Sequence, residues 1–336
     1  MATGTTSGRE AIESEIARQW LDALSSFADV RDRADEVAAS IRRSGRLLLL
    51  GMGASHGLNR AVEPVYRALH VDAVALPISE QLDQPLSIAD RTIIVTSQSG
   101  ESAEVIRWLN EVGPAAEAFG LTMAPNSTLA RSLPSLIGAG GVETAFAATR
   151  SILVCLALHA AILSALGTAP TTFVRALRSP KEPDISNAVI ALAGVRAVVT
   201  SGRRLQGLAE ALALGLTELS RLPCFSLECG QLRHGPMEML GPEVGMIFLR
   251  GDDPTSDLVR NLAEAVAATG APTVVLDSSG RTPVKGAITI DAGRHDGLAA
   301  LAILLPIAQR LMIEFAAVRV NDLGCPIRSQ KITRTE

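Results

Sequence analysis

Short runs of consecutive apolar residues alternate along the chain with longer segments in which apolar residues recur every three or four positions. Continuous apolar runs are typical of strands buried on both faces of a parallel sheet, and the longer spacing is typical of helices that cover such a sheet. We predict strands at residues 46–50, 71–76, 92–96, 118–123, 196–200, 245–250 and 272–277. We predict helices at residues 101–111, 127–133, 152–166, 205–222, 255–269 and 298–318. The alternation predicts the α/β class.

The two halves of the chain resemble each other. Residues 46–63 align without gaps onto residues 196–213, because in both segments an arginine precedes an apolar run, a turn, a Gly-Leu pair and a helix. The later predicted strands keep the same order in each half. We interpret the chain as a duplicated, doubly wound α/β unit in which each copy has three layers and a flavodoxin-like parallel sheet.

Charge and composition exclude several classes of partner. A net charge of −4 leaves no general basic surface, so we expect no nucleic-acid partner. The apolar run 152–166 is shorter than a membrane span, and the polar residues 1–10 do not resemble a signal peptide. The cysteines have no metal-ligand spacing and are too few for a disulfide scaffold: Cys155, Cys224, Cys229 and Cys325. We therefore expect a cytoplasmic protein without a metal or a membrane.

The segment SQSGES, residues 97–102, comes directly after a predicted strand and opens a predicted helix. Unpaired amides at a helix N-terminus favour an anion, and a glycine lets the backbone approach a ligand closely. The segment supplies hydroxyl and amide donors from Ser97, Gln98, Ser99 and Ser102, with Gly100 between them. A plain serine N-cap is the alternative. We favour a phosphate site, and we expect it only in the first half, because the matching turn at 251–257 begins with two adjacent aspartates, Asp252 and Asp253.

The turn GMGASHG, residues 51–57, partly matches the G-x-G-x-x-G fingerprint of dinucleotide-binding folds. That fingerprint needs a glycine at position 56, where this chain has His56, although Asp72 lies about where a ribose-binding acid would lie. We favour a second wall of the same sugar-phosphate pocket, formed by Gly53, Ala54 and Ser55. We expect no nucleotide cofactor.

Three residues in the second half of the chain and its tail are candidates for chemistry. Glu218 lies on the apolar face of a predicted helix, where desolvation would raise its pKa, or it pairs with Arg221. His234 precedes Gly-Pro on a forced turn and is either a general acid or base or a structural histidine. Lys331 belongs to a polar tail that is either frayed or folded into a dry pocket, where a neutral lysine could form a Schiff base.

These segments together resemble the sugar isomerase (SIS) domain family, and within it the isomerase half of glutamine:fructose-6-phosphate amidotransferase. The resemblance covers nearly the whole chain. It rests on residues 13–19, GASHG, SQSGES, the sixteen-residue step from Glu218 to a His-Gly-Pro at His234, and the tail lysine Lys331. SQSGES and LRHGP together make the resemblance fairly specific.

The resemblance implies a role for each matching residue. The serine turn, with Ser97, Gln98, Ser99 and Ser102, would hold the phosphate of a hexose or aminosugar, and Gly53 and Ser55 would line the opposite wall. Glu218 would move a proton between C1 and C2 of the open-chain sugar. His234 would assist ring opening from the neighbouring subunit of a homodimer, and Lys331 would form an imine with the keto sugar.

Departures from the family pattern narrow the function. The family lysine three residues before the glutamate is Gly215, a threonine of the second wall is Ala54, and a glutamate near the histidine is Gln231. No glutaminase domain is recognisable, so we expect no glutamine-driven synthesis. We expect a glucosamine-6-phosphate deaminase that releases ammonia. A fructosamine-6-phosphate deglycase and a non-catalytic sugar-phosphate sensor remain as alternatives.

The expected organisation follows from these assignments. It comprises an N-terminal arm or helix at 1–24, a phosphate-binding SIS subdomain at 25–170, a linker at 171–186, a second SIS subdomain at 187–324 and a tail at 325–336 that closes the active site.

Overall fold

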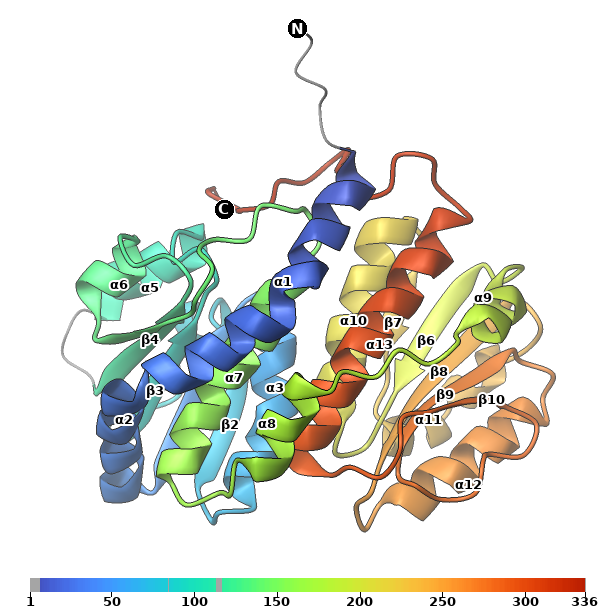
Figure 1. The fold of residues 1–336 in the computed structure, drawn as a ribbon, viewed down its shortest axis with the longest axis horizontal. Coiled ribbons are helices and arrows are strands. Elements are labelled where there is room, and N and C mark those ends of the chain that lie inside the picture. The colour runs from blue at the N-terminus through green and yellow to red at the C-terminus, as the bar shows by residue number, and fades with distance from the viewer. Residues whose placement is uncertain (1–6, 84, 113–116, 336) are drawn as a thin grey trace, which may run out of the picture. The chain divides into compact units, whose positions relative to one another are not determined.

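The computed structural model describes residues 7–83, 85–112 and 117–335. Its contacts divide the chain into two compact units. We call Ile12–Arg178 with Pro326–Glu336 the N-terminal unit, and Ser179–Cys325 with Met1–Ala11 the C-terminal unit (Figure 1). The expectations made for residues 1–6 and for Glu336 lie outside the described residues.

The described part of the N-terminal unit contains a five-stranded sheet in the order β2-β1-β3-β4-β5, with every pairing parallel. Four of the strands coincide with predicted ones, and the three-residue β5 was not predicted. The strands are β1 (Arg46–Gly51), β2 (Asp72–Pro77), β3 (Thr92–Thr96), β4 (Ala118–Thr122) and β5 (Ser135–Ile137). Strands β1 and β3 are buried almost throughout, as their continuous apolar sequences predict.

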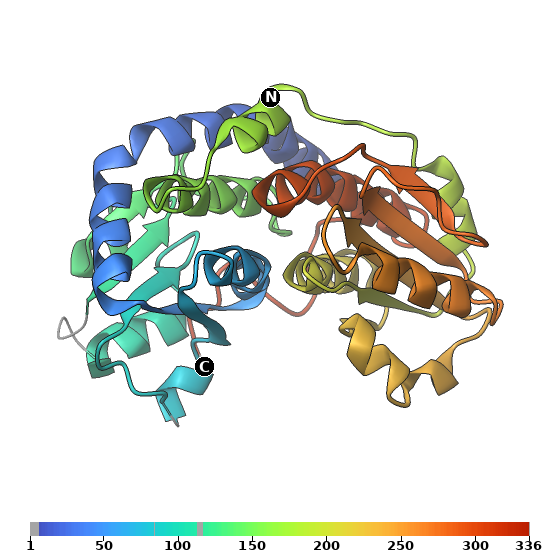
Figure 2. The same cartoon turned by 90° about the horizontal axis from the view of Figure 1, so that it is seen from below.

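Helices cover both faces of this sheet (Figures 1 and 2). One layer comprises α2 (Arg31–Ser44), α3 (Gly53–Arg67) and α7 (Arg150–Ala165). Helix α7 contacts both α2 and α3, and all three contact the sheet. The other comprises α4 (Glu80–Asp83), α5 (Ala103–Val112) and α6 (Thr128–Ser132). Alternate side chains of β1 and β3, including Leu48 and Ile93, pack with Trp108 of α5 in the core beneath this second layer.

The C-terminal unit, which is described throughout residues 179–325, repeats the arrangement with the strand order β10-β9-β8-β6-β7. Numbered from the first strand of each unit, both sheets follow the order 2-1-3-4-5, so the predicted duplicated flavodoxin-like fold is confirmed. Its strands are β6 (Ala197–Ser201), β7 (Cys224–Ser226), β8 (Val244–Gly251), β9 (Thr273–Ser278) and β10 (Ile288–Asp291).

The helices of the C-terminal unit also form two layers. Helices α10 (Gln206–Ser220) and α13 (Gly297–Ala317) pack together on one face, with α9 (Ser186–Leu192) against α13. Helices α11 (Cys229–Arg233) and α12 (Ser256–Ala267) share the core on the other face, followed after α11 by the 3-10 helix η2 (Pro236–Met239). Helix α13 is long and apolar enough to span a membrane, but 83% of its most apolar stretch is buried, as in a core helix of a soluble domain.

Two helices lie in segments that the hydrophobic pattern describes less well. Helix α1 (Gly8–Asp29) forms most of the expected N-terminal arm. Helix α8 (Thr171–Arg178) occupies the first half of the expected linker, because Phe173, Ala176 and Leu177 fall at helical spacing and are all buried. The ring of Phe173 packs against that of Phe27, which fixes α8 to the N-terminal unit.

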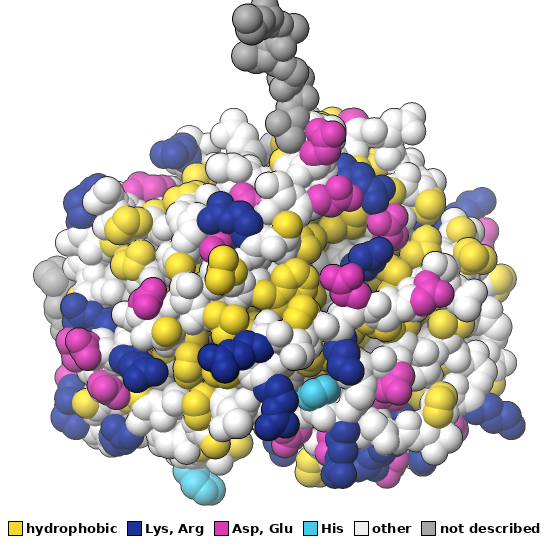
Figure 3. Space-filling model, in the orientation of Figure 1, with side chains coloured by type: hydrophobic (Ala, Val, Ile, Leu, Met, Phe, Trp, Pro, Cys, Tyr) yellow, Lys and Arg dark blue, Asp and Glu magenta, His cyan; other side chains and the backbone are white. Residues whose placement is uncertain are grey.

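Positive and negative side chains are interspersed on the face shown in Figure 3, without a continuous patch of either sign. This distribution agrees with the small net charge of −4.

Candidate functional site

The serine turn, residues 97–102, lies at the point in the N-terminal sheet where the strand order reverses. Strands β1 and β3 are neighbours, and their last residues Gly51 and Thr96 are paired in register. The loops that follow these strands therefore leave the sheet side by side, and the hydroxyl of Thr96 donates to Asn59 of α3 at 2.9 Å. Ligands of open α/β sheets bind at this reversal, outside the carboxyl ends of the strands.

The turn is shaped by hydrogen bonds between its own groups. Ser97 Oγ accepts the Gly100 N–H at 3.1 Å, and Ser99 Oγ accepts the Glu101 N–H at 3.2 Å. Ser97 and Ser99 are only 7% and 8% exposed. Because each oxygen accepts from the turn, each hydroxyl proton can be donated outward to an anion. Ser102, half-buried, directly precedes α5.

Gly100 permits this geometry for two reasons. Its φ of +64° lies in the left-handed region, and a Cβ added there would lie 2.3 Å from Ser127 Oγ and 2.6 Å from Ser127 Cβ. Ser127 cannot withdraw easily, because its Oγ donates to Ala124 and accepts from Ala130 as the N-cap of α6.

We therefore expect Gly100→Ala to displace the turn and weaken inorganic phosphate binding by about 10-fold or more, with a loss of about 1–3 kcal/mol in stability from the strained backbone. Calorimetric titration with phosphate and urea unfolding measure the two effects. Gly141→Ala is the matched control, since Gly141 also has a positive φ of +73° but no atom within 4 Å of an added Cβ. Equal phosphate affinity in the two variants would contradict the assignment of the turn.

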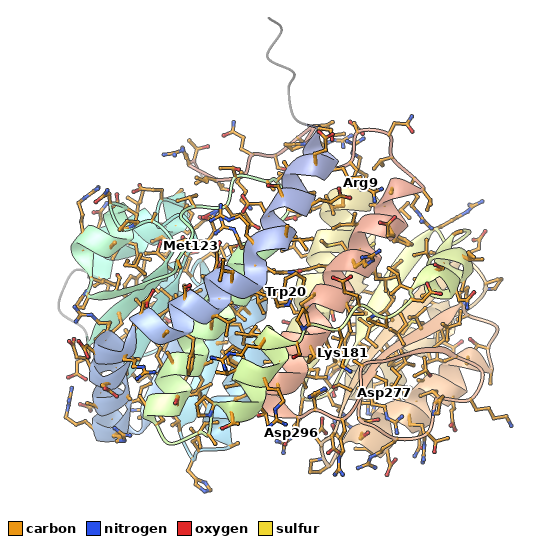
Figure 4. The ribbon with its side chains drawn as sticks, viewed as in Figure 1. Arg9, Trp20, Met123, Lys181, Asp277 and Asp296 are labelled. Carbon is orange, nitrogen blue, oxygen red and sulfur yellow. The ribbon has the colours of Figure 1, made fainter. Side chains whose placement is uncertain are left out.

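Gln98 connects the turn to the loop before α7. The side-chain Nε2 of Gln98 donates to the backbone carbonyl of Glu143 at 3.1 Å. The backbone carbonyl of Gln98 accepts the Met123 N–H at 3.0 Å (Met123 is labelled in Figure 4). The buried Gln98 Oε1 has no hydrogen-bond partner among the described residues. The NH2 group of the Gln98 side chain thus holds the loop, while its Oε1 remains available to accept from a sugar hydroxyl.

The expected second wall is the first turn of α3. Gly53 begins the helix with a φ of +52° and is exposed, while Ala54 and Ser55 are half-buried. The Ser55 N–H donates to the Met52 carbonyl at 3.1 Å. This turn follows β1 and so lies beside the serine turn, as the pairing of β1 with β3 requires.

The C-terminal tail returns to the N-terminal unit and contacts the same region at two points. The Thr333 carbonyl accepts the Ala103 N–H at 2.9 Å, at the start of α5. Lys331 Nζ lies 3.1 Å from Glu143 Oε2 and 3.4 Å from the Phe146 carbonyl, and its side chain is 20% exposed. The structure thus brings Lys331 into the unit that carries the serine turn.

Sequence reasoning did not identify Glu143. Its carboxylate is buried and accepts hydrogen bonds from Thr149 and Ser151 as well as from Lys331. The sequence offers only a weak signal, a single carboxylate in an otherwise small and apolar stretch, GAGGVETAFAAT at 138–149.

Glu218 lies in the C-terminal unit, on α10, and is half-buried. Arg221, the alternative partner expected from sequence, ends α10 in the left-handed conformation and binds Asp322 at 2.7 Å. One turn before Glu218, a Cβ on Gly215 would lie 2.2 Å from Met312 Sδ of α13. The close packing of α10 on α13 is therefore a physical reason for glycine at this position.

His234 is exposed in the C-terminal unit, in the bend between α11 and η2. The bend depends on Gly235, whose φ of +110° is open to glycine alone. Glu228 fixes the preceding turn by accepting the N–H groups of Gly230 and Gln231 as the N-cap of α11. His234 is thus presented outward on a rigid turn.

In the C-terminal unit, the turn that corresponds to the serine turn is residues 251–257, and its carboxylates bind groups of the same unit. Asp253 Oδ1 accepts both the N–H of Thr255 at 2.7 Å and its hydroxyl at 2.5 Å, immediately before α12. Asp252 pairs with Arg294 at 2.6 Å. We therefore still expect this turn to repel a phosphate, in contrast to the serine turn of the N-terminal unit.

The candidate residues therefore divide between the units. The N-terminal unit carries the predicted phosphate and sugar residues with the tail lysine: Gly53, Ala54, Ser55, Ser97, Gln98, Ser99, Ser102 and Lys331. The C-terminal unit carries the predicted acid–base residues Glu218 and His234. Their roles remain predictions.

Comparison with known proteins identifies the fold family. The family model described as SIS domain matches residues 190–319. The chain therefore contains a SIS domain over these residues. Over 264 residues it is 26% identical to a glutamine–fructose-6-phosphate aminotransferase of Lactiplantibacillus plantarum, an alignment that covers 72% of this chain and 44% of the relative. This SIS chain thus spans less than half the length of that relative, and the expected homology to its isomerase part is confirmed.

Solved SIS structures share the fold over nearly the whole chain. The C-terminal domain of glucosamine-fructose-6-phosphate aminotransferase from Francisella tularensis superposes with a TM-score of 0.78 at 17% identity, covering 94% of this chain and 98% of that one. A glucosamine-6-phosphate deaminase from Thermotoga maritima gives 0.74 at 18% identity, covering 96% and 99%. At these identities the likeness establishes the fold.

Proposed function

We propose that this SIS protein is a phosphosugar isomerase-type enzyme that converts glucosamine 6-phosphate and water into fructose 6-phosphate and ammonia. The serine turn is the observation that carries the proposal. Two buried serines, Ser97 and Ser99, lie in the turn just before α5 and next to the first turn of α3, an arrangement that would suit an anion. The names of the relatives, an aminotransferase acting on fructose 6-phosphate and a glucosamine-6-phosphate deaminase, support this class of substrate.

The reaction needs one residue that moves a proton between neighbouring carbons. We assign this role to Glu218, whose half-buried carboxylate removes the C2 proton of the open-chain aldehyde and returns it to C1. Together with transfer of a proton from the C2 amine to O1, this converts the C1 aldehyde and C2 amine into a C1 alcohol and a C2 ketimine. The Lys331 amine displaces ammonia from that ketimine, and water then hydrolyses the lysine imine to the ketone.

His234 is assigned to ring opening, and its exposure supports a role outside its own subunit. An exposed histidine on a rigid turn can reach a site in a neighbouring molecule, so we propose a homodimer whose active sites combine residues of both subunits. We place the enzyme in the cytoplasm, where phosphorylated sugars are found.

The direct test is incubation with glucosamine 6-phosphate, with ammonia and fructose 6-phosphate measured by coupled assays. We expect equimolar release of both products. Turnover of fructosamine 6-phosphates alone would replace the deaminase by a deglycase acting through the same proton transfer. Tight sugar-phosphate binding without turnover of either substrate would instead indicate a sensor.

A further inference from the structure

Glu143 holds a negative charge in a place where water cannot reach it. Its side chain is fully buried in the loop between β5 and α7. Oε1 accepts the N–H of Thr149 at 2.9 Å and its hydroxyl at 2.8 Å, and Oε2 accepts the hydroxyl of Ser151. A buried carboxylate is costly unless a positive charge compensates it.

The tail lysine supplies that compensation. Among the described residues, Lys331 is the cation paired with Glu143, at 3.1 Å. Arg150, although close in sequence, is committed elsewhere, because its guanidinium binds Glu15 and Asp22 of α1. Figure 1 shows the tail beside the loop that precedes α7.

Glu143 also connects its ion pair with Lys331 to the serine turn. The Glu143 carbonyl accepts from Gln98 Nε2, so the loop that carries the carboxylate is bound to the turn. The tail is held a second time where Thr333 accepts the Ala103 N–H at the start of α5. Lys331 Nζ is thus fixed near the proposed phosphate site through Glu143.

An ammonium group cannot attack a carbonyl, so Lys331 must lose a proton before it forms an imine. We propose that Glu143 is the base that accepts this proton and the residue that positions Lys331 for attack. The inference rests on the proposed function, since it concerns the imine-forming step of that reaction.

The step balances without a further reagent. A proton passes from Lys331 Nζ to Glu143 Oε2, and the neutral amine forms a bond to C2 of the ketimine, whose nitrogen takes up a proton and leaves as ammonia. Hydrolysis of the lysine imine then gives the ketone and returns Lys331. With fructose 6-phosphate, the same imine forms in the reverse direction when the amine adds to the C2 carbonyl and water is lost. Once the lysine leaves the pair, the buried carboxyl is more stable neutral than charged, which favours the transfer.

Two other ionisable groups have to be considered, one near Glu143 in space and one near it in sequence. The thiol of Cys155 on α7 stays protonated, because burial and the charge of Glu143 raise its pKa to about 12. The Arg150 guanidinium keeps its charge under all ordinary conditions and is neutralised by Glu15 and Asp22. Neither can replace Glu143 as the acceptor.

The test is reductive trapping of the full chain with fructose 6-phosphate and sodium borohydride over a range of pH, with mass spectrometry of the peptide that contains Lys331. We expect Glu143→Gln to lower the trapping rate at neutral pH by about 10²-fold. The deficit should shrink towards about pH 10, where hydroxide replaces the carboxylate as base. Glu143→Asp should restore part of the rate.

Glu63→Gln is the matched control, because Glu63 is another buried, ion-paired carboxylate of the N-terminal unit. Its trapping rate should match that of the wild type. The inference would be overturned if Glu143→Gln were trapped as fast as the wild type. It would also be overturned if the variant were equally slow at every pH, because hydroxide cannot compensate for the loss of a residue that only positions Lys331. Absence of trapping in the wild type would overturn the proposed function itself.

Discussion

Replacing Glu218 with glutamine is expected to lower kcat for glucosamine 6-phosphate by about 10²–10⁴-fold, the contribution of a positioned acid–base group. Glutamine keeps the size and much of the polarity of the side chain but cannot accept the C2 proton. Because the phosphate residues lie in the other unit, binding of fructose 6-phosphate should change little. Steady-state kinetics and calorimetric titration separate the two quantities.

Glu210→Gln provides the control for this experiment. Glu210 lies on the same helix about two turns earlier, is half-buried, and accepts from Gln206 at 3.3 Å. We expect near wild-type kcat for it. A Glu218→Gln enzyme that retains full kcat would exclude Glu218 as the proton carrier.

Mixing subunits tests whether the site is shared. Glu218→Gln and His234→Ala proteins should each be inactive, but a dissociated and reassembled equal mixture should recover about a quarter of wild-type activity if each site takes one residue from each subunit of a two-fold dimer. A mixture that stays inactive would place both residues in a site within one subunit.

The sheets could be predicted because their strands are continuous apolar runs, whereas the missed strands lack that signal. Strand β7 (Cys224–Ser226) has only three residues, and its central Phe225 is 41% exposed at the sheet edge. Strands β5 and β10 are equally marginal, with three and four residues. In such short edge strands, the pairing partner rather than the local sequence determines the structure.

The serine turn could be predicted for a related reason, because its donors, its glycine and the helix it opens are all within a few residues of one another. The buried ion pair of Glu143 could not be predicted, since its partner Lys331 lies 188 residues away in the sequence. The Arg150 network is similar, with partners in α1 that are 128 and 135 residues distant. Charged groups that become buried through such distant pairing leave no local pattern.

The second copy has an internal ion pair where the first copy has the serine turn. At the corresponding strand end, Arg250 of β8 is fully buried and donates to Asp277 Oδ2 at 2.9 Å and to Ser256 Oγ at 2.9 Å. Asp277, labelled in Figure 4, belongs to β9 and also accepts the Ser279 N–H at 2.7 Å. An internal ion pair therefore joins two strands and the start of α12.

Breaking this pair is expected to be the most destabilising of the substitutions considered. Asp277→Ala should lower the free energy of unfolding by about 3–5 kcal/mol, because it removes the buried partner of Arg250 and leaves only the half-exposed Asp257, at 3.9 Å, as a counter-charge. Urea unfolding of the full chain, followed by circular dichroism, measures the loss.

Glu243→Ala is the control, since Glu243 pairs with Arg196 at 3.3 Å but both side chains are more than half exposed. It should cost about 0–1 kcal/mol. The double variant Arg250→Met with Asp277→Leu should recover much of the stability lost in Asp277→Ala, because apolar side chains remove the uncompensated charge. If Asp277→Ala costs no more than Glu243→Ala, the buried pair contributes nothing to the stability of the C-terminal unit.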